Sequence, residues 1–124
     1  ALHALALERS TERGISLSSR IGACVQGPAL STPAERAWFA STGAELFAQG
    51  MAGPLMACAH AGLTALTLVA ITDGPVPEDA DPQGLNMAEL VASAEKAAPA
   101  LEDLVQSLLP DLGRVASERE AEYS

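Results

Sequence analysis

Residues 63–72 have the sequence LTALTLVAIT, and this stretch decides the fold class. It is rich in β-branched residues and carries apolar side chains on both faces, which predicts a strand that is buried on both sides. Strands of that kind lie inside parallel sheets whose two faces are covered by helices. Asp73, Gly74 and Pro75 then end the strand and open a loop that extends to Gly84.

The segments around this strand alternate between helix and strand patterns. Thr32 can cap a helix that has Pro33 in its first turn. Apolar periodicity predicts helices at 1–14, 32–42, 53–60 and 85–110, and strands at 15–26, 44–49 and 63–72. This order predicts an α/β fold with a largely parallel sheet. We expect Pro99 to kink the last helix and residues 111–124 to form a charged tail.

The number of predicted strands suggests that the sheet is incomplete. Three strands are few for a free-standing α/β domain, because sheets usually carry about five or six. We therefore expect residues 1–110 to be part of a larger domain. Since an exposed sheet edge favours association, we also expect a second polypeptide or an oligomer to cover that edge.

The composition excludes several classes of protein. Hydrophobic residues make up 48% of the 124 residues and charged ones 19%, which is typical of one globular domain. Sixteen acidic residues against seven basic ones give a net charge of −9, so we expect neither nucleic acid nor a membrane surface as partner. The spacing of the cysteines and histidines is not that of metal ligands (Cys24, Cys58, His3 and His60). We expect the two cysteines to be buried in a cytoplasmic protein.

Three loops that follow the predicted strands carry polar or glycine-rich residues, at 27–32, 49–54 and 73–84. Ligands of open α/β folds bind at such strand ends. Asp73 follows its strand directly and is the best candidate for a functional carboxylate. The alternative is that Asp73 only begins an Asp-Gly turn.

Five blocks of the sequence resemble the trimeric purine nucleoside phosphorylases. In chain order they are GPALSTPAE (27–35), GAE (43–45), HAGL (60–63), LVAITD (68–73) and LNMAEL (85–90). The resemblance covers residues 1–110, and chains of that family are much longer. It implies a phosphorylase/hydrolase-like sheet flanked by helices, of which this chain is roughly the C-terminal half.

The resemblance implies a site for a purine nucleoside. Ser31 and Asp73 occupy the base-recognising positions, and this pairing resembles the methylthioadenosine phosphorylase branch, which takes 6-aminopurines. Asp73, as the catalytic residue, would accept a hydrogen bond from the 6-amino group or, if protonated, donate one to N7 of the leaving purine. The other implied substrate-binding positions are Leu30 against the base, Thr72 beside Asp73, Gln49 beneath the ribose, Gly50 on the phosphate side and Met87 beside an apolar 5′ group.

The implied reaction is phosphorolysis, in which phosphate attacks C1′ and the purine leaves. Phosphate is then a co-substrate, and no metal or organic cofactor is implied. The chain departs from the family where Gln49-Gly50 replaces a Met-Ser/Thr pair and where Pro54 replaces a Glu. The family's glycine-rich phosphate loop belongs to the N-terminal half. We therefore expect activity only when a second polypeptide supplies that half, in a cytoplasmic homo-oligomer that resembles the family's trimer.

Two other functions stay open at this point. The chain could be a non-catalytic relic or binding subunit that keeps the fold but lacks the phosphate site. It could also be a hydrolase relative that uses water in place of phosphate. A second chain that carries the phosphate loop would distinguish the enzyme from the relic.

Overall fold

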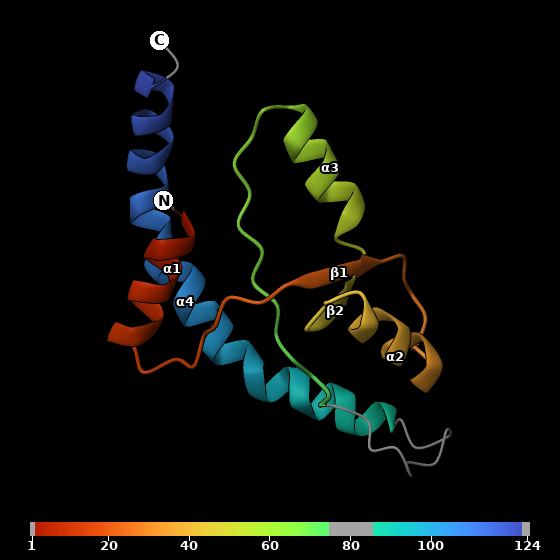
Figure 1. Ribbon diagram of the computed structural model, residues 1–124. Coiled ribbons are helices and arrows are strands. Elements are labelled where there is room, and N and C mark those ends of the chain that lie inside the picture. The colour runs from red at the N-terminus through yellow and green to blue at the C-terminus, as the bar shows by residue number, and fades with distance from the viewer. Residues whose placement is uncertain (1, 75–85, 123–124) are drawn as a thin grey trace. The chain divides into compact units, whose positions relative to one another are not determined.

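The computed structural model describes residues 2–74 and 86–122 and confirms an α/β fold. Two compact units divide the chain: a helical unit with the described residues of 1–18, 70–72 and 88–124, and a sheet unit with those of 19–69 and 73–87. The elements in chain order are α1 (Leu2–Glu12), β1 (Gly22–Val25), α2 (Pro33–Ser41), β2 (Leu46–Gln49), α3 (Ala52–His60) and α4 (Met87–Glu122) (Figure 1).

Two parallel strands form the centre of the sheet unit. The register of β1 with β2 is Gly22↔Leu46, Ala23↔Phe47, Cys24↔Ala48 and Val25↔Gln49. Parallel strands need a crossover connection, and α2 supplies it. At position 22 a Cβ would lie only 3.0 Å from Cδ1 of Leu46, so glycine allows the close approach of the two strands there.

The start of α2 is fixed by a capping box. Thr32 Oγ1 accepts a hydrogen bond from the Glu35 amide at 3.3 Å, and the Thr32 amide donates to Glu35 Oε2 at 2.7 Å. The hydrogen bonds from the backbone and the hydroxyl of Thr32 lower the pKa of Glu35. Pro33 lies in the first turn, where its missing N–H costs no helical hydrogen bond. Gly43, with φ +89°, follows the helix in a conformation that favours glycine.

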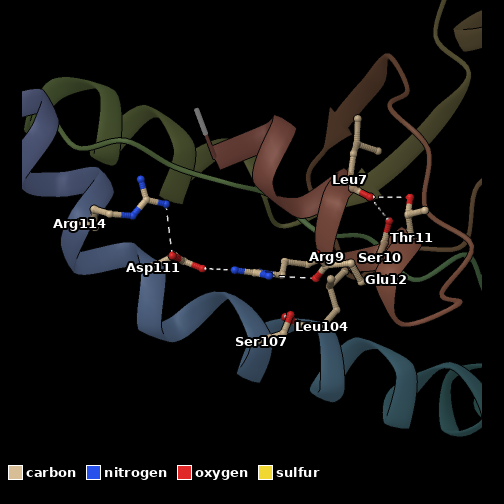
Figure 2. A network of polar contacts seen from close by, with 9 residues as sticks. All are labelled: Leu7, Arg9, Ser10, Thr11, Glu12, Leu104, Ser107, Asp111 and Arg114. Carbon is tan, nitrogen blue, oxygen red and sulfur yellow. Dashed lines mark hydrogen bonds and ion pairs between the residues drawn. The ribbon is translucent and has the colours of Figure 1, made fainter.

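Small residues and leucines form the core of the helical unit. Ala6 and Ser10 on α1 and Leu104 and Leu108 on α4 are each at most 3% exposed. Figure 2 shows Ser10 on α1 and Leu104 on α4, and small side chains such as those of Ala6 and Ser10 leave room for close packing. The Ser10 hydroxyl donates to the Leu7 carbonyl at 2.8 Å, so its burial leaves no unsatisfied donor.

Ion pairs join the same two helices (Figure 2). Arg9 on α1 donates to Asp111 on α4 at 2.8 Å. Arg13, the residue after α1, donates to Asp103 of α4 at 2.5 Å. Arg114 also donates to Asp111, at 3.2 Å, so two guanidinium groups share this carboxylate. The hydrogen bonds from Arg9 and then Arg114 lower the pKa of Asp111, and the bond to Asp111 raises the pKa of Arg9.

The strand expected at 63–72 is wrong. These residues have irregular backbone, and the sheet of the described residues consists of β1 and β2. Leu63 and Ile71 are 63% and 58% exposed, so the segment is not buried on both faces. A composition rich in β-branched and apolar residues indicates that the side chains suit the surface of a sheet. A strand also needs a hydrogen-bonded neighbouring strand, which composition does not specify. The described chain supplies no such neighbour for this segment.

Other expectations need smaller corrections. The first strand begins at Gly22 rather than at residue 15, while the first three helices lie where the pattern predicts them. The expected burial of the cysteines is wrong, because Cys24 is exposed and Cys58 is only half-buried. Cys24 falls on the exposed face of β1, whose residues alternate between exposed and half-buried positions.

The last helix is longer than predicted. α4 continues through both Pro99 and Pro110 to Glu122, so the charged segment after residue 110 is helical at its start. Each proline removes an amide donor from the helix, and Figure 1 shows α4 changing direction along its length. Within the described ranges, no helix combines the length and the apolar character that a membrane span requires.

We expect Leu104→Ala to lower the free energy of unfolding by about 2–5 kcal/mol, because truncation of a buried leucine leaves a cavity. Leu109→Ala is the matched control, since Leu109 lies on the same helix and is 58% exposed. It should change the free energy by less than about 0.5 kcal/mol. Urea denaturation followed by far-UV circular dichroism measures both. Equal losses in the two variants would contradict this assignment of the core.

Protonation of Asp111 should weaken the link between α1 and α4. The pKa of Asp111 is lower in the folded chain than its ordinary value of 3.8. Its ionised carboxylate therefore contributes fully to the free energy of unfolding at pH values above 3.8. The contribution is lost as the pH falls through the lower, folded pKa. Denaturation at a series of pH values measures this effect. As the pH falls, the free energy of unfolding should decrease more steeply in the unmodified protein than in Asp111→Asn. Parallel curves for the two proteins would contradict this role.

Candidate functional site

The carboxyl ends of β1 and β2 bring two of the predicted loops to one edge of the sheet. Parallel strands end at the same edge, and the Gly50 amide extends their pairing by donating to the Val25 carbonyl at 3.0 Å. Gly50 has φ +71°, a conformation that favours glycine. The loops that follow β1 and β2 therefore begin side by side.

Gln49 joins these two loops through its side-chain amide. Its Nε2 donates to the Ala29 carbonyl, and its Oε1 accepts from the Ala29 amide at 3.4 Å. A Cβ at Gly27 would lie 2.7 Å from the same Oε1, so any larger residue there would displace this amide. The Gln49 side chain thus holds the loop in place, and both ends of its amide are engaged.

Ser31 and Leu30 come next along this loop. Ser31 is 8% exposed, and no hydrogen bond joins its side chain to another residue in the described ranges. Leu30, in contrast, is 50% exposed. The loop therefore carries one buried serine and one apolar side chain that meets solvent, immediately before the cap of α2.

Asp73 forms an ion pair with Arg36 of α2. The contact joins Nη2 of Arg36 to Oδ2 of Asp73, and the two side chains are 16% and 29% exposed. The guanidinium lies over the ring of Phe47 on β2, with its central carbon 5.2 Å from the ring centroid. Asp73 is thus more than the first residue of a turn, because α2 and β2 hold its cationic partner in place.

Sequence reasoning missed Arg36 and Phe47. The available signal was that Arg36 is one of only seven basic residues and lies directly after the capping box of a helix that borders the first loop. Its partner is 37 positions away, and no local pattern identifies a pair at that separation.

Both arginines of the sheet unit are paired with carboxylates. In the described part of this unit the arginines are Arg20 and Arg36, and their partners are Glu45, at 3.0 Å, and Asp73. Glu45 also accepts a hydrogen bond from the Ile21 amide at 2.9 Å. That bond, and then the one from Arg20, lower the pKa of Glu45. In the described part of this unit, each arginine is therefore already paired with a carboxylate and is not available to bind a phosphate or another anion.

Two of the predicted site residues take no part in these contacts. Met87 is the first residue of α4 and is 58% exposed. Thr72 belongs to the helical unit, whose placement against the sheet unit is not determined. The structure thus brings Gln49 and Gly50 to the loop that carries Leu30 and Ser31. No group of three His, Cys, Asp or Glu residues in the described ranges is arranged to hold a metal ion.

The comparisons with known proteins give one finding. A family model described as the phosphorylase superfamily matches residues 1–110. Neither the curated proteins nor the solved structures contain a match. The matched range covers most of the chain, including the capped loop, both strands and the ion pair of Asp73. The chain therefore belongs to the phosphorylase superfamily, the family of the nucleoside phosphorylases.

Proposed function

We propose that this chain forms the base-binding, C-terminal half of a purine nucleoside phosphorylase that acts on 6-aminopurine nucleosides such as methylthioadenosine. Ser31 and Asp73 recognise the base, Leu30 packs against it, and Met87 lies beside the 5′ group of the nucleoside. Family membership supports the reaction class, since its members transfer a pentosyl group between a base and phosphate.

The observation that carries the proposal is the tether between Asp73 and α2. The Arg36 amide donates to the Thr32 carbonyl at 3.1 Å, so Arg36 lies one helical turn beyond the cap. Ser31 directly precedes that cap. A carboxylate bound by Arg36 is therefore held near the helix start that Ser31 precedes.

Hydroxyl and carboxylate together suit a 6-aminopurine. The amino group of such a base is a donor, for which the Asp73 carboxylate is an acceptor, and N1 is an acceptor, to which the Ser31 hydroxyl can donate. A 6-oxopurine would place its carbonyl oxygen against the carboxylate, and two acceptors facing each other lose a hydrogen bond. The pair thus favours adenine-type bases over hypoxanthine-type bases.

Phosphate binding calls for a second polypeptide. Gly50 offers a backbone N–H but no hydroxyl, and that amide already donates to Val25. Both arginines in the described part of the sheet unit are paired with carboxylates. A phosphate dianion that attacks C1′ needs cations or aimed donors around it. We propose that another chain supplies them, within a cytoplasmic homo-oligomer.

The same pairing of the arginines favours one alternative. If no second chain completes the site, the protein is a purine-binding subunit without catalysis. Base recognition by Ser31 and Asp73 is common to both functions, and only the fate of the glycosidic bond distinguishes them.

In the native assembly, we expect adenine to bind more tightly than hypoxanthine and Asp73→Asn to erode or reverse this preference. The amide would offer a donor toward a 6-oxo group. Each mismatched hydrogen bond in a desolvated pocket costs about 1–3 kcal/mol, so the affinity ratio should change about 5- to 150-fold. Titration calorimetry with the two bases measures the ratio.

The matched control for this substitution is Glu45→Gln. It also removes a carboxylate that pairs with an arginine of the sheet unit, but at the start of the strands. We expect it to leave the ratio of the two affinities unchanged. Equal affinities for adenine and hypoxanthine, both before and after substitution of Asp73, would refute the assignment of the base.

Release of adenine from methylthioadenosine by the native assembly tests the reaction itself. We expect release that requires phosphate and yields the sugar 1-phosphate, measured chromatographically with and without added phosphate. Release at the same rate without phosphate would instead identify a hydrolase. Binding of adenine with no release under either condition would leave the purine-binding subunit as the function.

A further inference from the structure

We propose that Arg36 is a positioning residue that sets the base preference of the site by fixing the orientation of the Asp73 carboxylate, which accepts a hydrogen bond from the base. This inference rests on the proposed function, since it concerns the same base-binding carboxylate. It adds a residue that contacts no substrate and acts only through Asp73.

The ion pair engages one oxygen of Asp73 and leaves the other available. Nη2 of Arg36 contacts Oδ2, and within the described ranges no hydrogen bond is made to Oδ1. The Asp73 side chain is 29% exposed. Arg36 therefore orients the carboxylate from one side, while the second oxygen remains free to accept a hydrogen bond from a ligand.

Aromatic rings keep the guanidinium of Arg36 in place. Its central carbon lies 5.2 Å from the centroid of Phe47, whose ring stacks on Phe39 of α2 at a centroid distance of 6.1 Å and an angle of 20°. The Arg36 side chain is 16% exposed. Nη2 binds Asp73, while Nε is buried without a hydrogen-bond partner in the described part of the chain. A guanidinium confined in this way holds its partner in a defined orientation.

The orientation of Asp73 decides how well its carboxylate meets a base. Arg36 binds this carboxylate from one side through a planar guanidinium, which fixes the direction of the remaining oxygen. A carboxylate oxygen accepts a hydrogen bond from a 6-amino group, whereas a 6-oxo group offers it no donor. A carboxylate held in this orientation therefore favours a 6-aminopurine, and one that can turn away loses part of that preference.

The test is the ratio of the affinities for adenine and hypoxanthine in Arg36→Met and Arg36→Lys, measured by calorimetry on the native assembly. We expect Arg36→Met to lower the ratio about tenfold, which is the effect of one mismatched hydrogen bond. Arg36→Lys should lower it less, because the lysine keeps the charge but not the planar geometry of the guanidinium. In an Asp73→Asn background, Arg36→Met should leave the ratio unchanged.

Arg20→Met is the matched control, since it removes the other described arginine of the sheet unit and leaves Asp73 untouched. It should keep the ratio of the unmodified protein. If Arg36→Met does not fold, Phe47→Leu replaces it, because that change removes the ring beneath the guanidinium without altering the charge. Trp38→Leu then serves as the control, because Trp38 is a 62% exposed aromatic residue of α2. We expect Phe47→Leu to lower the ratio and Trp38→Leu to preserve it.

The outcomes separate this inference from the proposed function. A preference for adenine that Arg36→Met leaves intact would overturn the role of Arg36 alone. Equal weakening of both bases would also overturn it, because a merely structural role affects both affinities alike. An unmodified protein that shows no preference for adenine would overturn the proposed function and the inference together. A lower ratio in Arg36→Met that disappears in the Asp73→Asn background would support both.

Discussion

Parallel pairing of β1 with β2 is the constraint on which the candidate site depends. Because the two strands run in the same direction, Val25 and Gln49 end at one edge, and the Gln49 amide can hold the loop at Ala29. A shift of the register by one residue would turn the Gln49 side chain to the opposite face of the sheet. The loop that carries Ser31 would then lose this hydrogen-bonded support.

Local signals in the sequence were sufficient for much of the fold. A capping box joins Thr32 to Glu35, and Pro33 lies in the first turn between them. These signals lie within four residues, so a short pattern predicts the start of α2. Gly43 and Gly62 have positive φ values after α2 and α3, where the sequence predicts helix ends. The family resemblance, confirmed by the match to residues 1–110, likewise rests on contiguous motifs.

Features that depend on distant partners could not be predicted in the same way. Residues 63–72 have the composition of a buried strand, but a strand also requires a neighbour, which composition does not specify. Asp73 was singled out from its place after this segment, while its partner Arg36 was missed because the two are 37 positions apart. Pro110 suggested the end of the last helix, yet α4 continues to Glu122, and Asp111 just beyond the proline pairs with Arg9 of α1.

The pairing of α1 with α4 has a consequence for how the chain folds as it is synthesised. Arg9 and Asp111 are 102 positions apart, and Arg13 and Asp103 are 90 apart, so the first helix meets its partner only after the last helix has been made. Contacts between distant positions slow folding, because a long loop must close before they form. During translation, Ala6 and Ser10 of α1 therefore stay exposed to solvent until α4 has been made. The two strands and α2 lie close together in the sequence and can assemble earlier. Asp111 also lies one residue beyond the range of the family match, so a chain trimmed to that range would lose the carboxylate that Arg9 and Arg114 share.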